Sequence, residues 1–397
     1  MKRINLKKIN AARSGTIRDI NRHIVLNYVR EKGPISRAEI AQETALQRST
    51  VSLIVDGLKG QGLIDEISGE STGGRPPILL QLRAEEPIAI GVDLGTAGTI
   101  IATSDLAGHV LQREEFEAEP DYELTLDRIV QTVRRFVRED PGIEGVGISI
   151  PGVVDSETGN ALFIPHFKWR DLAIGEELEA ATGLPVKIDN DANAAALAEL
   201  WFGQSEIREV RDFILVLVEG GLGTGVVFDG QVYHGVAGAA GEFGHMTIGT
   251  GAPVLCASGS DECWEAFASE RAAVARYAKL SRQSNGGNSL SFVELMDRAS
   301  GGDQAAITAL LETAHYLGVG ISNLIKGLSP EAVVVGGRIA SVWPLIVNEL
   351  KRAVDESSIC RGLPSARIIG STLGEYPTLM GALSMVLVSK FSSLIEA

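Results

Sequence analysis

The chain has 397 residues, of which 45% are hydrophobic, so it is long enough for two or three domains with cores of their own. No apolar run approaches the roughly 20 residues that span a bilayer, and the basic N-terminus lacks the apolar segment of a signal peptide, so we expect no membrane partner. Three cysteines are too few for a disulfide framework, which favours a reducing cytoplasm.

The net charge of −15 is distributed unevenly along the chain. Residues 1–83 hold 14 Lys and Arg against 8 Asp and Glu, whereas the remainder holds 22 against 43. A basic head on an acidic body suggests that only the head meets a polyanion.

The basic head has the pattern of a winged helix. An apolar stripe predicts a first helix over 16–32, which ends before Gly33-Pro34. Ser36 and Glu39 form a capping box that opens a second short helix, and a third helix follows a tight turn at 45–46. The first helix is expected to bury Ile17, Ile20, Ile24, Tyr28 and either Val25 or Leu26, and the third Val51, Ile54, Val55 and Leu58.

Two short helices around a tight turn predict a helix-turn-helix, with the later helix in the DNA groove. The residues expected to contact DNA bases at the start of that helix are Gln47, Arg48, Ser49, Thr50 and Ser52. Two strands, near 62–64 and 78–82, follow, and the loop between them carries Arg75, which would touch phosphate or enter a minor groove. The alternative is a three-helix protein-interaction module with a solvated charged surface.

The acidic body contains one arrangement twice: a strand, a Gly-rich turn and a second strand, near 88–104 and 213–229. Asp93 ends the first strand of the first unit, and Gly95 shapes its turn. Taken alone, that unit fits a plain β-hairpin as well as a phosphate loop. A phosphate-cradling hairpin in each half is typical of a duplicated actin-like ATPase fold. A further apolar strand ends at Gly336-Gly337, where glycine allows a close backbone approach.

Polar side chains gather where the strand over 186–190 gives way to an Ala-rich helix. Asn190 and Asp191 at this strand end fit a ligand site, and they equally fit capping of the helix. The two roles are compatible. A later stretch, 241–265, adds further polar residues and potential metal ligands, which are Glu242, His245, Cys256, Cys263 and Glu265.

The ordered set of a helix-turn-helix, DLGTAGT, IPGVVD, DNDANAAALAE, GGLGTG, GEFGH, C-x6-C-x-E and VVVGGR resembles the ROK family over essentially the whole chain. That family contains sugar kinases and sugar-responsive repressors. The resemblance implies an α/β fold with a winged helix over 1–83 and a two-lobed, actin-like ROK domain over 84–397. The first lobe would span about 88–195 with the C-terminal helix 377–391, and the second about 196–376.

The resemblance also implies roles for individual residues. Those that would hold sugar hydroxyls are Asn190, Asp191, Glu242, His245 and Glu265. Asp191 would also be the general base of a kinase reaction. The positions that would face ATP and magnesium are Asp93, Gly95, Gly221, Gly223, Gly225, Gly336 and Gly337.

Two departures from the family pattern bear on cofactors. The kinase loop reads D-x-G-G-T, whereas Thr96-Ala97 follow Gly95 here, and a β-branched residue crowds an approaching phosphate. ATP and magnesium binding are therefore in doubt, which favours a sensor over an enzyme. In the zinc loop Ser258 replaces the middle cysteine, which leaves His245, Cys256 and Cys263 as ligands. A water or a neighbouring carboxylate could complete a weaker zinc site, or the loop binds no metal.

These features predict a sugar-responsive transcriptional regulator, expected to be a repressor. Its head would bind operator DNA as a homodimer or a dimer of dimers, with a monosaccharide or sugar derivative in the cleft as effector. One alternative is an ATP-dependent sugar kinase that retains a DNA-binding head. Another is a sensor whose partner is a transport-system protein rather than DNA.

Overall fold

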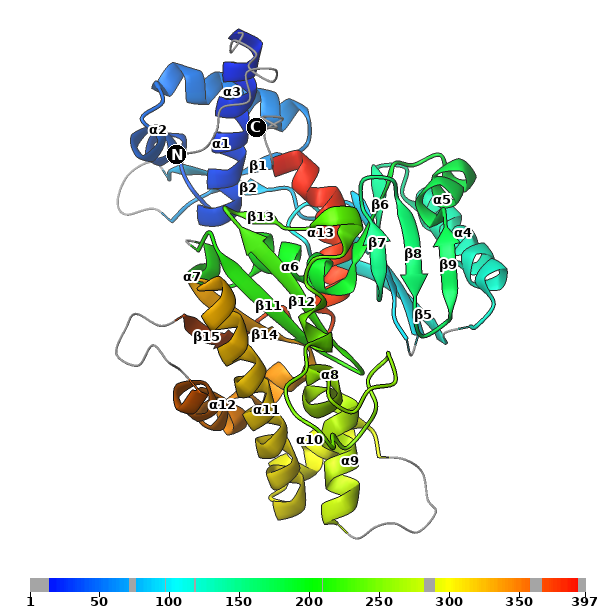
Figure 1. The fold of residues 1–397 in the computed structure, drawn as a ribbon. Helices are drawn as coiled ribbons and strands as arrows, with labels where there is room; N and C mark the ends of the chain where they lie inside the picture. The colour runs from blue at the N-terminus through cyan, green and yellow to red at the C-terminus, as the bar shows by residue number, and fades with distance from the viewer. Residues whose placement is uncertain are drawn as a thin grey trace.

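The computed structural model describes residues 14–70, 76–96, 98–117, 119–208, 210–281, 290–357 and 366–391. It has an α/β fold in which a small N-terminal head sits on a body built around two five-stranded sheets (Figure 1). Within the described ranges, no helix combines the length and the apolar character needed to cross a bilayer.

The head is a winged helix, as the sequence predicts. It contains α1 (Ser14–Lys32), α2 (Arg37–Thr44), α3 (Arg48–Gly60), β1 (Ile64–Ser68) and β2 (Ile78–Leu82). Ser36 caps α2 with both hydrogen bonds of a capping box, and Ala45 ends that helix in the left-handed conformation, with φ 57°. β1 and β2 pair antiparallel, with Ile64 opposite Leu82.

The buried face of α1 differs from the predicted stripe. Val25 and Leu26 are both fully buried and Val29 is 1% exposed, whereas Ile17 is 52% exposed. The prediction was wrong because α1 is covered on several sides, by α3, β2 and α13 (Pro377–Phe391), so a single stripe does not describe its contacts. In α3 the expected residues pack inward, with Val51, Val55 and Leu58 buried and Ile54 partly buried.

The first sheet of the body has the strand order β10-β6-β3-β4-β5. Its strands are β3 (Ala89–Leu94), β4 (Gly98–Ser104), β5 (Val110–Glu117), β6 (Gly145–Ile150) and β10 (Val186–Asn190). β3, β6 and β10 are parallel, so their carboxyl ends meet at one edge. Beside this sheet lie α4 (Tyr122–Glu139), α5 (Ile174–Thr182) and a three-stranded sheet of β7 (Val153–Asp155), β8 (Asn160–Ile164) and β9 (Trp169–Leu172).

The second sheet has the order β13-β12-β11-β14-β15 and the same pattern of antiparallel and parallel pairs as the first. Its strands are β11 (Phe213–Val218), β12 (Leu222–Phe228), β13 (Gln231–Val232), β14 (Ala332–Gly336) and β15 (Arg367–Gly370). This repeated topology is the duplication that the two strand–turn–strand units predicted.

The remaining elements include one long helix, α11 (Gln304–Leu328), which packs along α12 (Trp343–Ser357). The other helices are α6 (Asp191–Phe202), α7 (Ser205–Arg208), α8 (Trp264–Ala268), α9 (Glu270–Leu280) and α10 (Phe292–Ser300). Among the described residues, three short 3-10 segments are η2 (Val236–Gly238), η3 (Glu242–His245) and η4 (Arg338–Val342).

Helices α6 and α13 lie against each other between the two sheets (Figure 1). Small residues bring their backbones together: a Cβ on Gly381 would lie 2.2 Å from the carbonyl carbon of Ala194. A Cβ on Gly147 of β6 would likewise lie 1.9 Å from the carbonyl oxygen of Ala382. These contacts leave no space for a side chain, so the two helices and the first sheet form one close-packed unit.

The core of the head continues into the body. One apolar cluster contains Leu26, Val55 and Leu80 of the head together with Leu387 and Phe391 of α13. The side-chain amide of Asn27 also donates to the carbonyl oxygen of Phe391 at 2.8 Å. The head is therefore packed on the body rather than tethered to it.

Candidate functional site

The start of α3 presents polar side chains at the surface of the head. Gln47, Arg48 and Ser49 are exposed, and Thr50 and Ser52 are partly buried. Leu53 lies one turn after Ser49 and is 75% exposed. An exposed apolar side chain on this face suits a thymine methyl group. The sequence reading missed it because a leucine amid buried apolar residues gives no sign of exposure. Arg75 lies outside the described residues.

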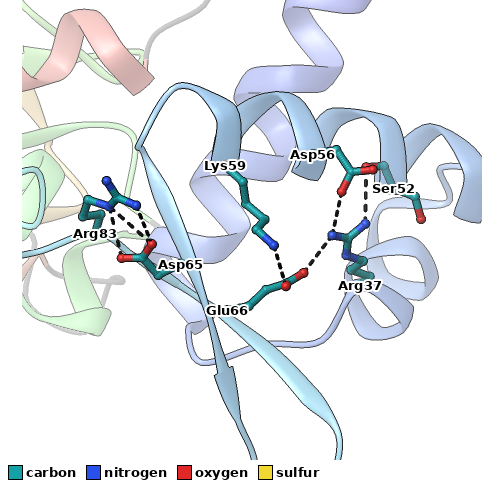
Figure 2. A network of polar contacts seen from close by, with 7 residues as sticks. All are labelled: Arg37, Ser52, Asp56, Lys59, Asp65, Glu66 and Arg83. Atoms are coloured by element: carbon teal, nitrogen blue, oxygen red, sulfur yellow. Dashed lines mark hydrogen bonds and ion pairs between the residues drawn. The ribbon is translucent and has the colours of Figure 1, made fainter.

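A polar network fixes α3 against the rest of the head (Figure 2). The Nη2 atom of Arg37 in α2 donates to Asp56 of α3 and to Glu66 of β1, each at 2.8 Å. Lys59 of α3 also donates to Glu66, while Arg83 pairs with Asp65, the residue before Glu66 in β1. Single surface ion pairs contribute little to stability, but this network joins α2, α3 and the first wing strand in one arrangement.

The site expected in the cleft between the lobes begins at the edge where the parallel strands β3, β6 and β10 end. In the register of the sheet, Ser149 lies between Asp93 and Asp189. Asp93 accepts a hydrogen bond from Thr378 Oγ1 of α13 at 2.7 Å. Burial raises the pKa of Asp93 to about 6, although hydrogen bonds from Thr378 and Ser149 oppose the shift.

Asn190 has the capping role that the sequence allowed, and its ligand role stays a prediction. It is the N-cap of α6, and its Oδ1 accepts from the backbone of Ala192 and Asn193. Its Nδ2 donates to the carbonyl oxygen of Gly152 at 2.9 Å, which ties the start of α6 to the loop after β6. Capping thus holds the polar group at the cleft.

Asp191 is the first residue of α6. One of its oxygens accepts from the backbone N–H of Ala192 at 2.8 Å. Burial, together with the negative charges of Asp93 and Glu242, raises the pKa of Asp191 to about 7, although the hydrogen bond from Ala192 opposes the shift. A carboxyl group whose pKa lies near neutral pH is partly ionised there, and its oxygens can accept hydrogen bonds from hydroxyl groups.

Asp189 has a partner that the sequence reading did not consider. His234 Nε2 lies 2.8 Å from Asp189 Oδ2, and this hydrogen bond raises the pKa of His234 despite partial burial. The pair joins β10 of the first sheet to the loop after β13 of the second. Its sequence signal is weak, because 45 residues separate the two positions.

The stretch from η3 to α8 supplies the second wall. Glu265 is 7% exposed in its side chain, and its Oε1 accepts from Ala257 N at 2.9 Å and Arg271 Nη2 at 3.0 Å. Glu242 and His245 lie 3.8 Å apart on η3 and are partly exposed. The burial of Glu242 and the charge of Glu265 both raise the pKa of Glu242, while His245 lowers it.

The start of β12 brings these two walls together. A Cβ on Gly221 would lie 3.1 Å from Glu265 Oε2, and a Cβ on Gly223 would lie 3.8 Å from Asp191 Oδ1. Gly244 of η3 packs on the carbonyl oxygen of Leu222. The structure therefore gathers the residues predicted to hold sugar hydroxyls around one strand end.

The glycines predicted to cradle phosphate have packing reasons of their own. Helix α6 crosses β12 at these glycines. A Cβ on Gly223 would lie 2.9 Å from the Cβ of Ala192, and a Cβ on Gly225 would lie 2.4 Å from the carbonyl oxygen of Ala192. Gly337 has a φ of 89°, and a Cβ on it would meet the carbonyl oxygen of Val218 at 2.0 Å. Close packing thus accounts for glycine at these positions without a phosphate ligand.

Two acidic residues of the cleft were missed by the sequence reading. Burial, together with the charges of Asp93, Asp191 and Glu270, raises the pKa of Glu219 to about 8. Burial raises the pKa of Glu270 to about 7, although Arg338 lies 3.4 Å away. Two guanidinium groups lie beside these carboxyls: Arg338 is next to Glu270, and Arg271 donates to the carbonyl oxygen of Gly220, the residue after Glu219.

His245, Cys256 and Cys263 converge on one point, as the zinc interpretation requires. Their ligand atoms all lie within 4.8 Å of one another, and the two sulfurs are 3.1 Å apart. The Ser258 hydroxyl is 2.9 Å from Cys256 Sγ, at the side where the family has a further cysteine. Burial raises the pKa of Cys256, but hydrogen bonds from Ser258, Cys263 and the backbone bring it down to about 6.

Three N and S donors fit a zinc ion with one position left for an oxygen ligand. Bound there, the ion would brace the loop between η3 and α8. Replacing Ser258 with cysteine is expected to complete four N and S ligands, so that this variant retains zinc through dialysis against a chelator that strips the wild-type chain. Metal analysis after dialysis checks this, with Ser68→Cys, at an exposed position of β1 in the head, as the control. Equal zinc retention in S258C and S68C would contradict it.

Comparison with known proteins identifies the family. Residues 89–389 match the ROK family. The chain belongs to the ROK family. It is 32% identical to the xylose repressor of Caldicellulosiruptor bescii, with 95% of this chain and 97% of the relative covered, and 29% identical to that of Bacillus subtilis, with 96% and 97% covered.

Solved structures divide this ROK chain into a shared body and a regulator's head. A ROK family transcriptional regulator, a homologue of the Escherichia coli MLC protein, matches with a TM-score of 0.75 and 28% identity over 95% of this chain and 98% of the other. A ROK family glucokinase from Streptomyces griseus, in complex with glucose and AMPPNP, matches with a TM-score of 0.69 and 29% identity over 75% of this chain and 98% of the other. Similarity over the full length, winged helix included, assigns the chain to the regulator branch.

Proposed function

We propose that this ROK protein is a sugar-responsive transcriptional repressor whose head binds operator DNA and whose cleft binds D-xylose as effector. The observation that supports it best is the joint presence of an exposed polar α3 start and a cleft that gathers Asp191, Glu242 and Glu265. The two xylose repressors aligned over nearly the whole chain support D-xylose as the sugar.

The proposed sugar contacts are Asn190, Asp191, Glu242, His245 and Glu265. Carboxylates accept hydrogen bonds from vicinal hydroxyls, and burial at the cleft strengthens each bond. The proposed DNA contacts are Gln47, Arg48, Ser49, Thr50 and Ser52, together with Arg75 from the wing loop. We also propose that the chain divides at residue 84, that the body has two lobes, and that the protein forms a homodimer or a dimer of dimers. Operator binding would place the protein in the cytoplasm.

The cleft chemistry favours a sensor over a kinase. Thr96 adds a side chain at the first loop, with its hydroxyl 3.9 Å from where a Cβ on Gly220 would lie. Sugar-dependent ATP turnover that disappears in Asp191→Asn would instead support the kinase alternative.

Binding of the purified chain to DNA from upstream of its own gene tests the proposal. If the head neutralises six to ten phosphates, affinity should fall by about 10³ to 10⁵ between about 50 and 200 mM salt. Addition of D-xylose should weaken operator binding, whereas D-glucose and N-acetylglucosamine should have smaller effects. Fluorescence anisotropy measures both. No salt-sensitive binding would overturn the proposal, and a partner protein captured without DNA would favour the transport-system alternative.

A further inference from the structure

We propose that Arg30 of α1 is the joint through which the cleft controls the head, with α6 and α13 acting together as the connecting element. The inference rests on the proposed function, because it supposes that a sugar in the cleft changes DNA affinity. Arg30 itself is not among the proposed sugar or DNA contacts.

Both helices begin in the cleft. α6 starts with Asp191 and is capped by Asn190, two of the proposed sugar contacts. α13 starts at Pro377, and Thr378 in its first turn donates a hydrogen bond to Asp93 at 2.7 Å. A sugar at Asn190 and Asp191 would therefore act directly on the first turn of α6, and α13 would follow through its close packing on α6.

Both helices end on the same side chain of the head. The guanidinium of Arg30 lies 4.6 Å from the ring centroid of Trp201, in the last turn of α6. It also lies 4.9 Å from the ring of Phe391, the last residue of α13. Arg30 is 11% exposed in its side chain and pairs with Glu31 at 2.8 Å. Desolvation makes such cation–π contacts worth more than at an exposed site.

The two helices are built to move as one body. They run side by side, the backbone of Gly381 packs on Ala194, and the rings of Trp201 and Phe391 are 6.2 Å apart. At about 1.5 Å per residue, the 12 residues of α6 carry a displacement over about 18 Å. Figure 1 shows α13, in red, ending beside the blue α1.

The contact has room to change. A cavity of about 340 Å³ lies at this junction, lined by Arg30, Glu31 and Leu82 of the head side and by Trp201, Phe202 and Met380 of the two helices, among others. Unfilled space next to the Arg30 contact allows the helix ends to shift against α1 without opening the apolar core. The head would then tilt as α6 and α13 move.

The test is the effect of D-xylose on operator affinity in Arg30→Ala. Wild-type coupling is expected in the usual range of about 5- to 150-fold. R30A should bind operator and D-xylose with near wild-type affinities, by anisotropy and calorimetry, yet lose most of the coupling. Arg22→Ala is the matched control, since Arg22 lies on the same helix but donates to Gln61 within the head. R22A should keep the coupling.

A second variant guards against loss of folding in R30A. Trp201→Leu keeps an apolar side chain but removes one ring, and it should reduce coupling without adding to the effect of R30A in the double variant. Full coupling in R30A or W201L, or equal loss in R22A, would overturn the inference alone. A wild-type chain whose operator affinity ignores D-xylose would overturn the proposed effector, and this inference with it.

Discussion

Replacing Asp191 with asparagine is expected to weaken D-xylose binding by about 10- to 100-fold, the loss typical of a hydrogen bond to a charged group. The amide keeps an oxygen for the Ala192 N–H, so α6 should still begin at the same place. Isothermal titration calorimetry measures the affinity, and operator binding without sugar should be unchanged. Asp127→Asn, on an exposed face of α4, is the control. An affinity within twofold of wild type in D191N would remove Asp191 from the site.

The same residue should make sugar binding depend on pH. Burial and the charges of Asp93 and Glu242 raise the pKa of Asp191 to about 7 in the free protein. Hydroxyl groups that donate to the carboxylate favour its ionised form, so binding should lower this pKa and release a proton. D-xylose affinity should therefore rise as the pH increases from about 6 to 8, and D191N should flatten that rise. An affinity that falls over this range would contradict the assignment.

Replacing Glu219 with glutamine is expected to stabilise the sugar-free protein at pH 8, by an amount on the order of 2–4 kcal/mol. Burial raises the pKa of Glu219 to about 8 from an ordinary value of 4.5. The folded chain thus holds this proton more tightly than the unfolded chain. Below the pKa of Glu219 in the unfolded chain, this side chain does not reduce the free energy of unfolding. As the pH rises from there toward 8, the free energy of unfolding falls, and glutamine, which cannot ionise, avoids this fall.

Thermal unfolding at pH 5 and pH 8 checks this expectation. The difference between E219Q and wild type should be small at pH 5, where both side chains are neutral, and largest at pH 8. Glu115→Gln, on the exposed side of β5, should show no such trend. If E219Q proved less stable than wild type at pH 8, Glu219 would have a bound counter-charge in solution.

Local signals in the sequence predicted much of the architecture. The capping box of Ser36 and Glu39 and the apolar positions Val51, Val55 and Leu58 act within a few residues, so they can be read directly. The duplicated strand–turn–strand units predicted the two sheets for the same reason. α1 was predicted less well, because what it buries depends on α13, at the other end of the chain.

The residues of the proposed sugar site could be predicted only in part. Asn190 and Asp191 were recognisable because a strand end and a helix start coincide there. Glu219 and Glu270 were not, since an acidic residue in a sequence looks the same whether it is buried or solvated. Gly223 and Gly225 were assigned to phosphate because local sequence does not distinguish a ligand approaching a backbone from a helix crossing it.

The apolar cluster shared by the head and α13 has a consequence for how the chain unfolds. Leu26, Leu80 and Phe391 are each at most 2% exposed, and they belong to one cluster rather than to two. A head cut from the body would leave Leu387 and Phe391 facing water, so the two parts should melt in a single cooperative transition. A member of the fold that dispenses with the head therefore needs polar residues at the end of its last helix.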